Sequence, residues 1–354
     1  MAAFDIKKLL QSVVSHGASD LHLVSRTEPQ IRLDGALKPV NLPKMTGEDI
    51  EEMCYSLITE KQKQQFEEND ELDFALLLPS IGRFRANYYR TLGDTAAAFR
   101  TIPIEIPSLD DLGAPDIYKK LVKREKGLIL VTGPTGSGKS TTLAAMINEI
   151  NLNEHKHIVT VEDPVEFIHQ NKKCIFSHRG VGEDTHSFAL ALKYAMRQDP
   201  DIILIGEMRD KETIEAALTA AETGHLVFGT LHTSSAPGTI NRIIDVFSGD
   251  EQPQIRAMIS SSLVAVVAQA LLPKLGGGRV AASEILVTNP AISNLIREDK
   301  VHQIYSQMQL GQGDTGMQTQ TQALLKFLRD GKVSREVALQ YANKPEEVAR
   351  ASVR

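Results

Sequence analysis

A glycine-rich stretch near the middle of the chain, GLILVTGPTGSGKSTTL, most constrains what this sequence can fold into. The apolar run Leu128 to Val131 predicts a short buried strand, and residues 139–150 predict a helix. The turn between them fits G-x-x-x-x-G-K-[ST], the pattern of a phosphate-binding loop, in the strand–loop–helix context that the pattern requires. We therefore predict that the chain binds a nucleoside triphosphate.

The chemistry of phosphate binding explains the composition of this loop. Glycines let backbone N–H groups surround phosphate oxygens without steric conflict, and the N-terminus of the following helix adds a favourable dipole. Lys139 has the reach to bind the β and γ phosphates, and the Ser140 hydroxyl is a ligand for Mg²⁺. The residues expected to bind ATP are Gly133, Pro134, Thr135, Gly136, Ser137, Gly138, Lys139, Ser140 and Thr141.

The pattern of apolar residues divides the chain into two predicted domains. Residues 1–101 contain several strand-like runs with few helices, which is typical of a compact α+β domain. Residues 102–117, rich in proline, predict a linker or hinge, and residues 118–354 form the second domain, whose tail from about 290 is helical. In that domain strands alternate with helices, which favours a mostly parallel sheet covered on both faces. Its strands are expected at 127–132, 157–162, 174–178, 201–206, 225–231 and 279–287.

Composition narrows the class of protein. The net charge of −6 does not indicate a general nucleic-acid-binding surface. Cys54 and Cys174 are the only 2 cysteines, which speaks against a zinc ribbon or a disulfide scaffold and suits a reducing cytoplasm. Acid and lysine residues interrupt the apolar residues of the N-terminal segment, so it is not expected to be a secretory signal. The longest apolar run, 263–272, is interrupted by Gln269 and too short to cross a bilayer. Work at a membrane would require docking to something already there.

Acidic residues at predicted strand ends are candidates for catalysis. Glu207 follows the bare apolar strand Ile202 to Ile205, the Walker B arrangement, in which a carboxylate supports Mg²⁺ or polarises the attacking water. Glu162, Asp163 and Glu166 follow another strand, at the sheet edge where ligands bind in such folds. One of them is a candidate to position water, although acidic loops are also common without function.

Histidines and arginines are weaker candidates. His225 and His232 flank a predicted buried strand, where a histidine either senses the γ-phosphate or is only a structural group. The arginines of the first domain are either its solvated face or donors to a phosphate bound elsewhere. These arginines are Arg83, Arg85, Arg90 and Arg100.

In combination these motifs resemble the type IV pilus retraction ATPases (PilT-like) of the type II/IV secretion ATPase superfamily. The phosphate-binding loop, VEDPVEF, DIILIGEMRD, ETGHLVFGTLHT and PAISNLIRED occur in one order, and the similarity begins at GASDLHL. The resemblance implies a PAS-like first domain followed by a RecA-like ATPase domain, assembled as a homohexameric ring. Glu166 then matches the catalytic glutamate, Glu207 the Walker B acid, and His225 with His232 the histidine box.

The resemblance also implies a function. Members of the family place ATP between the two domains at a subunit boundary, where Arg85 and Arg100 are our favoured arginines. The chain is then a Mg²⁺-dependent, cytoplasmic motor for pilus retraction and twitching motility, docked on an inner-membrane platform protein. Relatives that assemble pili or secrete proteins usually carry a tetracysteine site and an extra N-terminal domain, which this chain is expected to lack. Ser293 lies where the retraction motif usually has arginine.

Other functions remain open on the sequence. An accessory pilus or secretion ATPase has the same motifs, and a nucleotide-gated scaffold would bind ATP with little turnover. A nucleic-acid translocase is disfavoured because no basic or aromatic strand-binding run is evident. A small-molecule kinase would leave the first domain and the histidine box unexplained.

Overall fold

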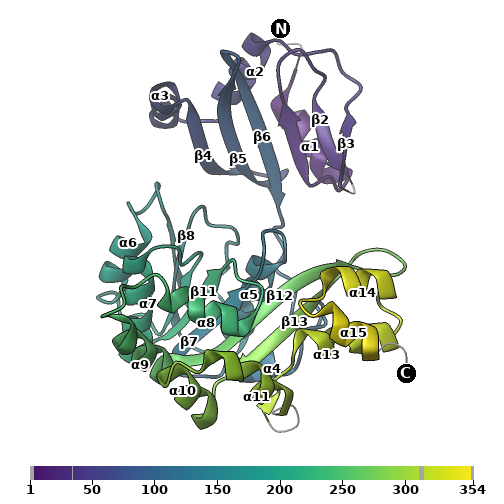
Figure 1. Cartoon of the computed structure of the whole chain (residues 1–354). Coiled ribbons are helices and arrows are strands. Elements are labelled where there is room, and N and C mark those ends of the chain that lie inside the picture. Colours follow the sequence, from purple (N-terminus) through teal and green to yellow (C-terminus); the bar gives the residue numbers. More distant parts are fainter. Residues whose placement is uncertain (1–3, 34, 311–314, 352–354) are drawn as a thin grey trace. The chain divides into compact units, whose positions relative to one another are not determined.

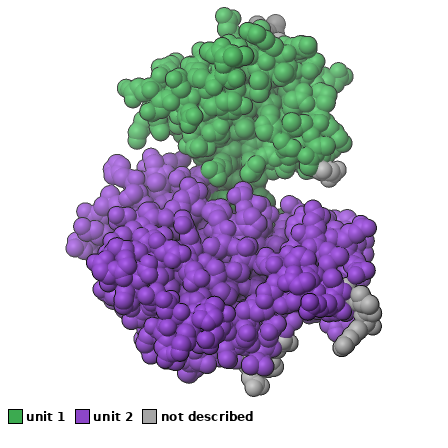
Figure 2. All heavy atoms as spheres, in the orientation of Figure 1, with its two compact units in different colours: residues 1–105, 166–168 green, residues 106–165, 169–354 purple. Residues whose placement is uncertain are grey.

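The structure is a computed structural model that describes residues 4–33, 35–310 and 315–351. Its contacts divide the chain into two compact units (Figure 2). Unit 1 comprises residues 1–105 together with 166–168, and unit 2 comprises residues 106–165 and 169–354. Residues 106–117, including the buried Leu109, therefore belong to unit 2, although the sequence assigned them to a linker.

Unit 1 is an antiparallel sheet with helices on one face. Its strand order is β3-β2-β1-β6-β5-β4 (Figure 1). Apolar residues alternate with polar ones along the strands, so that Leu21, Phe99 and Tyr88 lie in the core while their neighbours lie on the other face. The elements are α1 (Ile6–Ser15), β1 (Asp20–Leu23), β2 (Gln30–Leu33), β3 (Ala36–Pro39), α2 (Gly47–Tyr55), α3 (Glu60–Asn69), β4 (Glu71–Leu78), β5 (Gly82–Thr91) and β6 (Asp94–Ile102).

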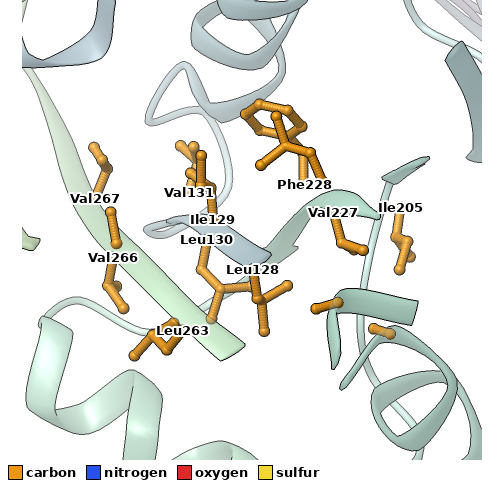
Figure 3. Close-up of a cluster of buried hydrophobic side chains, with 14 of the residues drawn as sticks. Leu128, Ile129, Leu130, Val131, Ile205, Val227, Phe228, Leu263, Val266 and Val267 are labelled. Carbon is orange, nitrogen blue, oxygen red and sulfur yellow. The ribbon is translucent and has the colours of Figure 1, made fainter. Parts of the chain in front are cut away.

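Unit 2 is built on a seven-stranded sheet of order β13-β12-β7-β11-β10-β8-β9. All neighbouring strands are parallel except β12 and β13, which are antiparallel. Every residue of β7, β10 and β11 is buried, which requires cover on both faces of the sheet. Figure 3 shows some of the buried apolar side chains of this sheet, among them Leu130, Phe228 and Val266. The strands are β7 (Gly127–Thr132), β8 (His157–Glu162), β9 (Ile175–Gly180), β10 (Ile202–Ile205), β11 (Leu226–Leu231), β12 (Leu263–Pro273) and β13 (Arg279–Val287).

The helices of unit 2 cover this sheet, and the last of them form the C-terminal region of the unit. The last helices have a small apolar core of their own with residues of β12 and β13, which includes Leu272, Leu324 and Val348. The helices are α4 (Ile117–Leu121), α5 (Lys139–Asn153), α6 (Phe188–Ala195), α7 (Lys211–Glu222), α8 (Ala236–Ile244), α9 (Gln252–Ser262), α10 (Pro290–Arg297), η1 (Val301–Gln303), α11 (Ile304–Leu310), α13 (Gln320–Arg329), α14 (Arg335–Tyr341) and α15 (Pro345–Ala351).

The predicted fold class, an α+β unit followed by an α/β unit with a mostly parallel sheet, is confirmed. The main difference concerns residues 263–272, which the sequence showed only as an apolar run and which form β12, between β7 and β13. A buried strand has no polar face to reveal its period, so its apolar run does not separate it from other buried segments. Within the described ranges, no helix combines the length and apolarity needed to cross a membrane.

Candidate nucleotide-binding site

The phosphate-binding loop lies between the end of β7 and the start of α5, as the sequence predicts. Gly133, Gly136 and Gly138 have φ angles of 145°, 80° and 86°, which favour glycine. At Gly133 a Cβ atom would also lie 2.2 Å from the Gln269 carbonyl oxygen and 2.6 Å from Ser137 Oγ. The loop is therefore too tightly packed at Gly133 for any other residue.

Donor groups of the loop fit a bound triphosphate. Helix α5 begins after Gly138 without a side-chain cap, so its first N–H groups are available to phosphate oxygens. Lys139 Nζ donates to the carbonyl oxygens of Gly133 at 2.7 Å and Pro134 at 3.1 Å, so its amine lies over the loop. Ser137 Oγ is buried and has no hydrogen-bond partner among the described residues, as expected of an anion cradle.

Glu207 and His232 meet beside this loop. His232 Nε2 lies 2.8 Å from Glu207 Oε1, and the Arg209 guanidinium forms an ion pair with the same oxygen. Burial opposes ionisation of Glu207, but Arg209 and His232 outweigh it and lower the pKa of Glu207 below its ordinary value of 4.5. The carboxylate is therefore ionised at neutral pH. The sequence did not single out Arg209, although it lies in the quoted segment DIILIGEMRD.

Parallel strands bring these groups to one edge of the sheet. Leu231, the last residue of β11, accepts a hydrogen bond from the Gly133 N–H at 3.3 Å, and Val161 of β8 accepts one from Gly206 at 2.8 Å. The carboxyl ends of β7, β8, β10 and β11 are therefore neighbours, which is where open α/β sheets bind ligands. The loop, Glu207 and His232 form one site.

His225 is not part of this group within the chain. It precedes β11, and its carbonyl accepts from Gly127 at the start of β7, whereas the loop follows the end of β7. At about 3.3 Å per residue, the strand separates His225 from His232 by roughly 20 Å. His225 Nδ1 contacts the Ala220 carbonyl at 3.0 Å, a structural contact at the end of α7.

The acidic segment after β8 is divided between the two units. Glu162 ends β8 and is buried, and Asp163 follows it in unit 2. Glu166 is grouped with unit 1, where Arg83 Nη1 donates to its carbonyl oxygen at 2.6 Å.

Arg85 and Arg100 lie directly opposite each other on β5 and β6. Arg100 Nε donates to Asp20 Oδ1 at 2.8 Å, and the Asp20 side chain is also 3.7 Å from Arg32 Nε. Arg90 is committed elsewhere, because it pairs with Glu51 at 2.9 Å and stacks on Phe66. The polar face of the unit 1 sheet thus presents Arg85 and Arg100 side by side.

The residues at the loop also fit Mg²⁺, which prefers oxygen ligands and keeps waters and substrate phosphates in its coordination sphere. Ser140 is half-buried in the first turn of α5, and Glu207 is an ionised carboxylate at the same sheet edge. The described residues contain no cluster of three or more histidine, cysteine, aspartate or glutamate side chains suited to a metal ion. Ser140 and Glu207 are therefore the candidate ligands, with phosphate oxygens and water completing the set.

Sequence comparisons identify the known proteins that this chain resembles. Residues 2–278 match the family model described as "Type II/IV secretion system protein". The "Type IV pilus retractation ATPase PilT" of Pseudomonas aeruginosa is 50% identical over 342 residues, which are 97% of this chain and 99% of that protein. The "Type IV pilus ATPase PilU" of the same organism is 40% identical over 340 residues, 96% of this chain and 89% of that protein.

A solved structure extends the likeness to three dimensions. The crystal structure of the pilus retraction motor PilT with bound ADP has a TM-score of 0.91 and 48% identity, and it covers 98% of this chain and 99% of the solved one. The family match spans most of the sequence, and the sequence similarity extends through both units. The chain therefore belongs to the type II/IV secretion system protein family.

Proposed function

We propose that this protein is a Mg²⁺-dependent ATPase motor that powers retraction of type IV pili. The observation that supports this most is the single site formed by the phosphate-binding loop, Glu207 and His232 at the carboxyl edge of the sheet. Relatives named for pilus retraction and twitching motility match over nearly the whole chain, at 50% and 48% identity.

The side chains take distinct parts in the proposed reaction. Lys139 exchanges the carbonyls of Gly133 and Pro134 for phosphate oxygens, and the uncapped N–H groups of α5 bind the same anion. Ser140 and Glu207 would hold Mg²⁺, which neutralises phosphate charge when bound. Glu166 orients the attacking water or accepts its proton, and His232 keeps the Glu207 carboxylate in place.

Assembly and force generation belong to the same proposal. The chain would act as a homohexamer in which Arg85 and Arg100 contribute to phosphate binding. A hinge within 102–117 would convert the nucleotide cycle into rotation of the domains. The hexamer would dock from the cytoplasm on the inner-membrane platform protein of the pilus. No nucleic acid is required.

The test combines a biochemical and a cellular measurement. Purified protein should release phosphate from ATP in the presence of Mg²⁺, and Lys139→Ala should abolish this release; a nucleotide-gated scaffold would give little release from either. Cells without the gene should carry excess surface pili if filaments are made but not withdrawn. Bald cells would instead indicate an assembly motor, and unchanged pili an accessory ATPase.

A further inference from the structure

Gln269 is a buried polar residue in an otherwise apolar strand. It lies in β12 and is only 4% exposed. Its neighbour Ala268 pairs with Thr132 at the end of β7, so Gln269 lies beside the point where the phosphate-binding loop leaves the sheet. Burying a primary amide is unfavourable unless its donor and acceptor groups are both used.

Both groups of the Gln269 amide bind the loop or the helix after it. Nε2 donates to the Ser137 carbonyl oxygen at 2.6 Å, and Oε1 accepts from the Thr142 hydroxyl at 2.9 Å. A carbonyl can only accept, so the contact with Ser137 assigns Nε2 to that side of the amide. One side chain therefore connects β12 to the loop and to the first turns of α5.

The bond to Ser137 also determines the direction of the next N–H group. The C=O of Ser137 and the N–H of Gly138 belong to one planar peptide group and point in opposite directions when the bond is trans. Because Gln269 holds the carbonyl toward β12, the Gly138 N–H points away from β12. Backbone N–H groups of such loops are the donors that bind phosphate oxygens.

Close packing of Gln269 against two loop glycines adds a second constraint. Its carbonyl oxygen would lie 2.2 Å from a Cβ atom at Gly133, and its Nε2 would lie 2.9 Å from one at Gly138. The first and last glycines of the loop are therefore both packed against this residue. Gln269 contacts the loop at its start, near its end and at the following helix.

We propose that Gln269 is a positioning residue that preorganises the phosphate-binding loop for the nucleotide. This inference rests on the proposed ATPase function and adds to it a residue outside the loop, on a strand more than a hundred residues away in sequence. Without this side chain, the bond that orients the Ser137–Gly138 peptide is lost, and nucleotide binding must then order the loop.

The test compares two buried glutamines with similar bonding. Gln320 in α13 is 5% exposed, and its amide donates to the Tyr341 carbonyl at 3.1 Å and accepts from the Asn343 N–H at 2.6 Å. Gln269→Leu and Gln320→Leu thus each remove two buried hydrogen bonds. ADP affinity, the KM and kcat for ATP, and the melting temperature without nucleotide are measured for both variants.

Gln269→Leu should weaken ADP binding about tenfold, which corresponds to about 1.4 kcal/mol, and raise KM more than it lowers kcat. Both variants should lower the melting temperature by similar amounts, but Gln320→Leu should bind ADP like the wild type. Equal ADP affinity for the two variants would overturn the inference. If Gln269→Leu does not fold, Gln269→Asn, which keeps the amide but is too short to reach Ser137, is judged by the same criterion.

Nucleotide binding by the wild type separates this inference from the proposed function. A wild type that binds no nucleotide contradicts the proposed function itself, and with it the inference. A wild type that binds ADP, beside a Gln269→Leu variant that binds it equally well, contradicts only the role of Gln269. Thr142→Val, which leaves the bond to Ser137 in place, should retain more ADP affinity than Gln269→Leu; the reverse order would also contradict the inference.

Discussion

His232 and Glu207 are joined by a contact of 2.8 Å between Nε2 and Oε1, across the ends of two neighbouring strands. Glu207 follows β10, and His232 follows β11. Arg209 binds the same carboxylate oxygen, so the acid is held from two sides. This arrangement orients a carboxylate at the same sheet edge as the phosphate-binding loop.

Removing the His232 side chain should therefore slow hydrolysis more than it weakens binding. We expect His232→Ala to lower kcat about 10–100-fold, the usual cost of losing an orienting partner of a metal-site ligand, with little change in ADP affinity. His232→Gln retains a donor and should recover most of the rate. His225→Ala, at the other end of β11, should cost much less. An equal fall in kcat for the two alanine variants would contradict this prediction and indicate that His225 contacts nucleotide bound to another subunit.

Replacing Glu166 should separate catalysis from binding. Glu166→Gln removes the proposed base while keeping its size, so hydrolysis should fall about 10²–10⁴-fold and ADP affinity should stay unchanged. Single-turnover phosphate release is the appropriate measurement. The exposed Glu346 in α15 supplies the matched control, since Glu346→Gln should hydrolyse ATP normally. Wild-type turnover in Glu166→Gln would remove this residue from the mechanism.

Two loop glycines should tolerate alanine differently. At Gly133 the added Cβ would meet backbone and side-chain atoms at 2.2 Å and 2.6 Å, whereas at Gly136 nothing lies within 4 Å. Gly136→Ala then costs only the positive φ, about 1–2 kcal/mol. Without nucleotide, Gly133→Ala should lower the melting temperature more than Gly136→Ala does. It should also weaken ADP binding at least about 100-fold, because the loop must move to make room for the Cβ atom. Similar melting temperatures for both variants would contradict the packing described at Gly133.

The pH dependence of stability tests how Arg100 contributes to the stability of unit 1. Burial opposes ionisation of Asp20, but Ser19 and Arg100 outweigh it and lower the pKa of Asp20 from its ordinary value of 3.8. A lowered folded-state pKa stabilises the fold above that ordinary value, and this stability is lost as the pH falls through the folded-state pKa.

Arg100→Ala should therefore lower the melting temperature of the protein at pH 7 by roughly 2–4 °C, and the difference from wild type should shrink as the pH falls below about 4. Arg85→Ala is the control, because it removes the opposing arginine without removing the partner of Asp20. A constant difference at all pH values would show that Arg100 acts other than through the Asp20 carboxylate.

Local patterns explain how much of the fold was predictable. The apolar run Leu128 to Val131 predicted a strand because the signal for it lies entirely in adjacent residues of the sequence. The structure confirms that strand as β7. The strand β12 was not predicted, since no recognisable motif flanks its apolar run, whereas the phosphate-binding loop that follows Leu128 to Val131 identified that run as a strand. Its polar residue, Gln269, was visible in the sequence only as an interruption, and its contacts with Ser137 and Thr142 depend on the strand order.

The phosphate-binding loop follows from local sequence alone, because glycines, a lysine and the start of a helix are specified within about a dozen residues. The side chains that join this loop from distant parts of the chain depend instead on how the strands pack into one sheet. Parallel pairing of β10 and β11 brings Glu207 to His232, and the length of β11 takes His225 to the opposite edge of the sheet. The physical reason is that strand order and register depend on burial summed over the whole sheet, and no single segment contains that information.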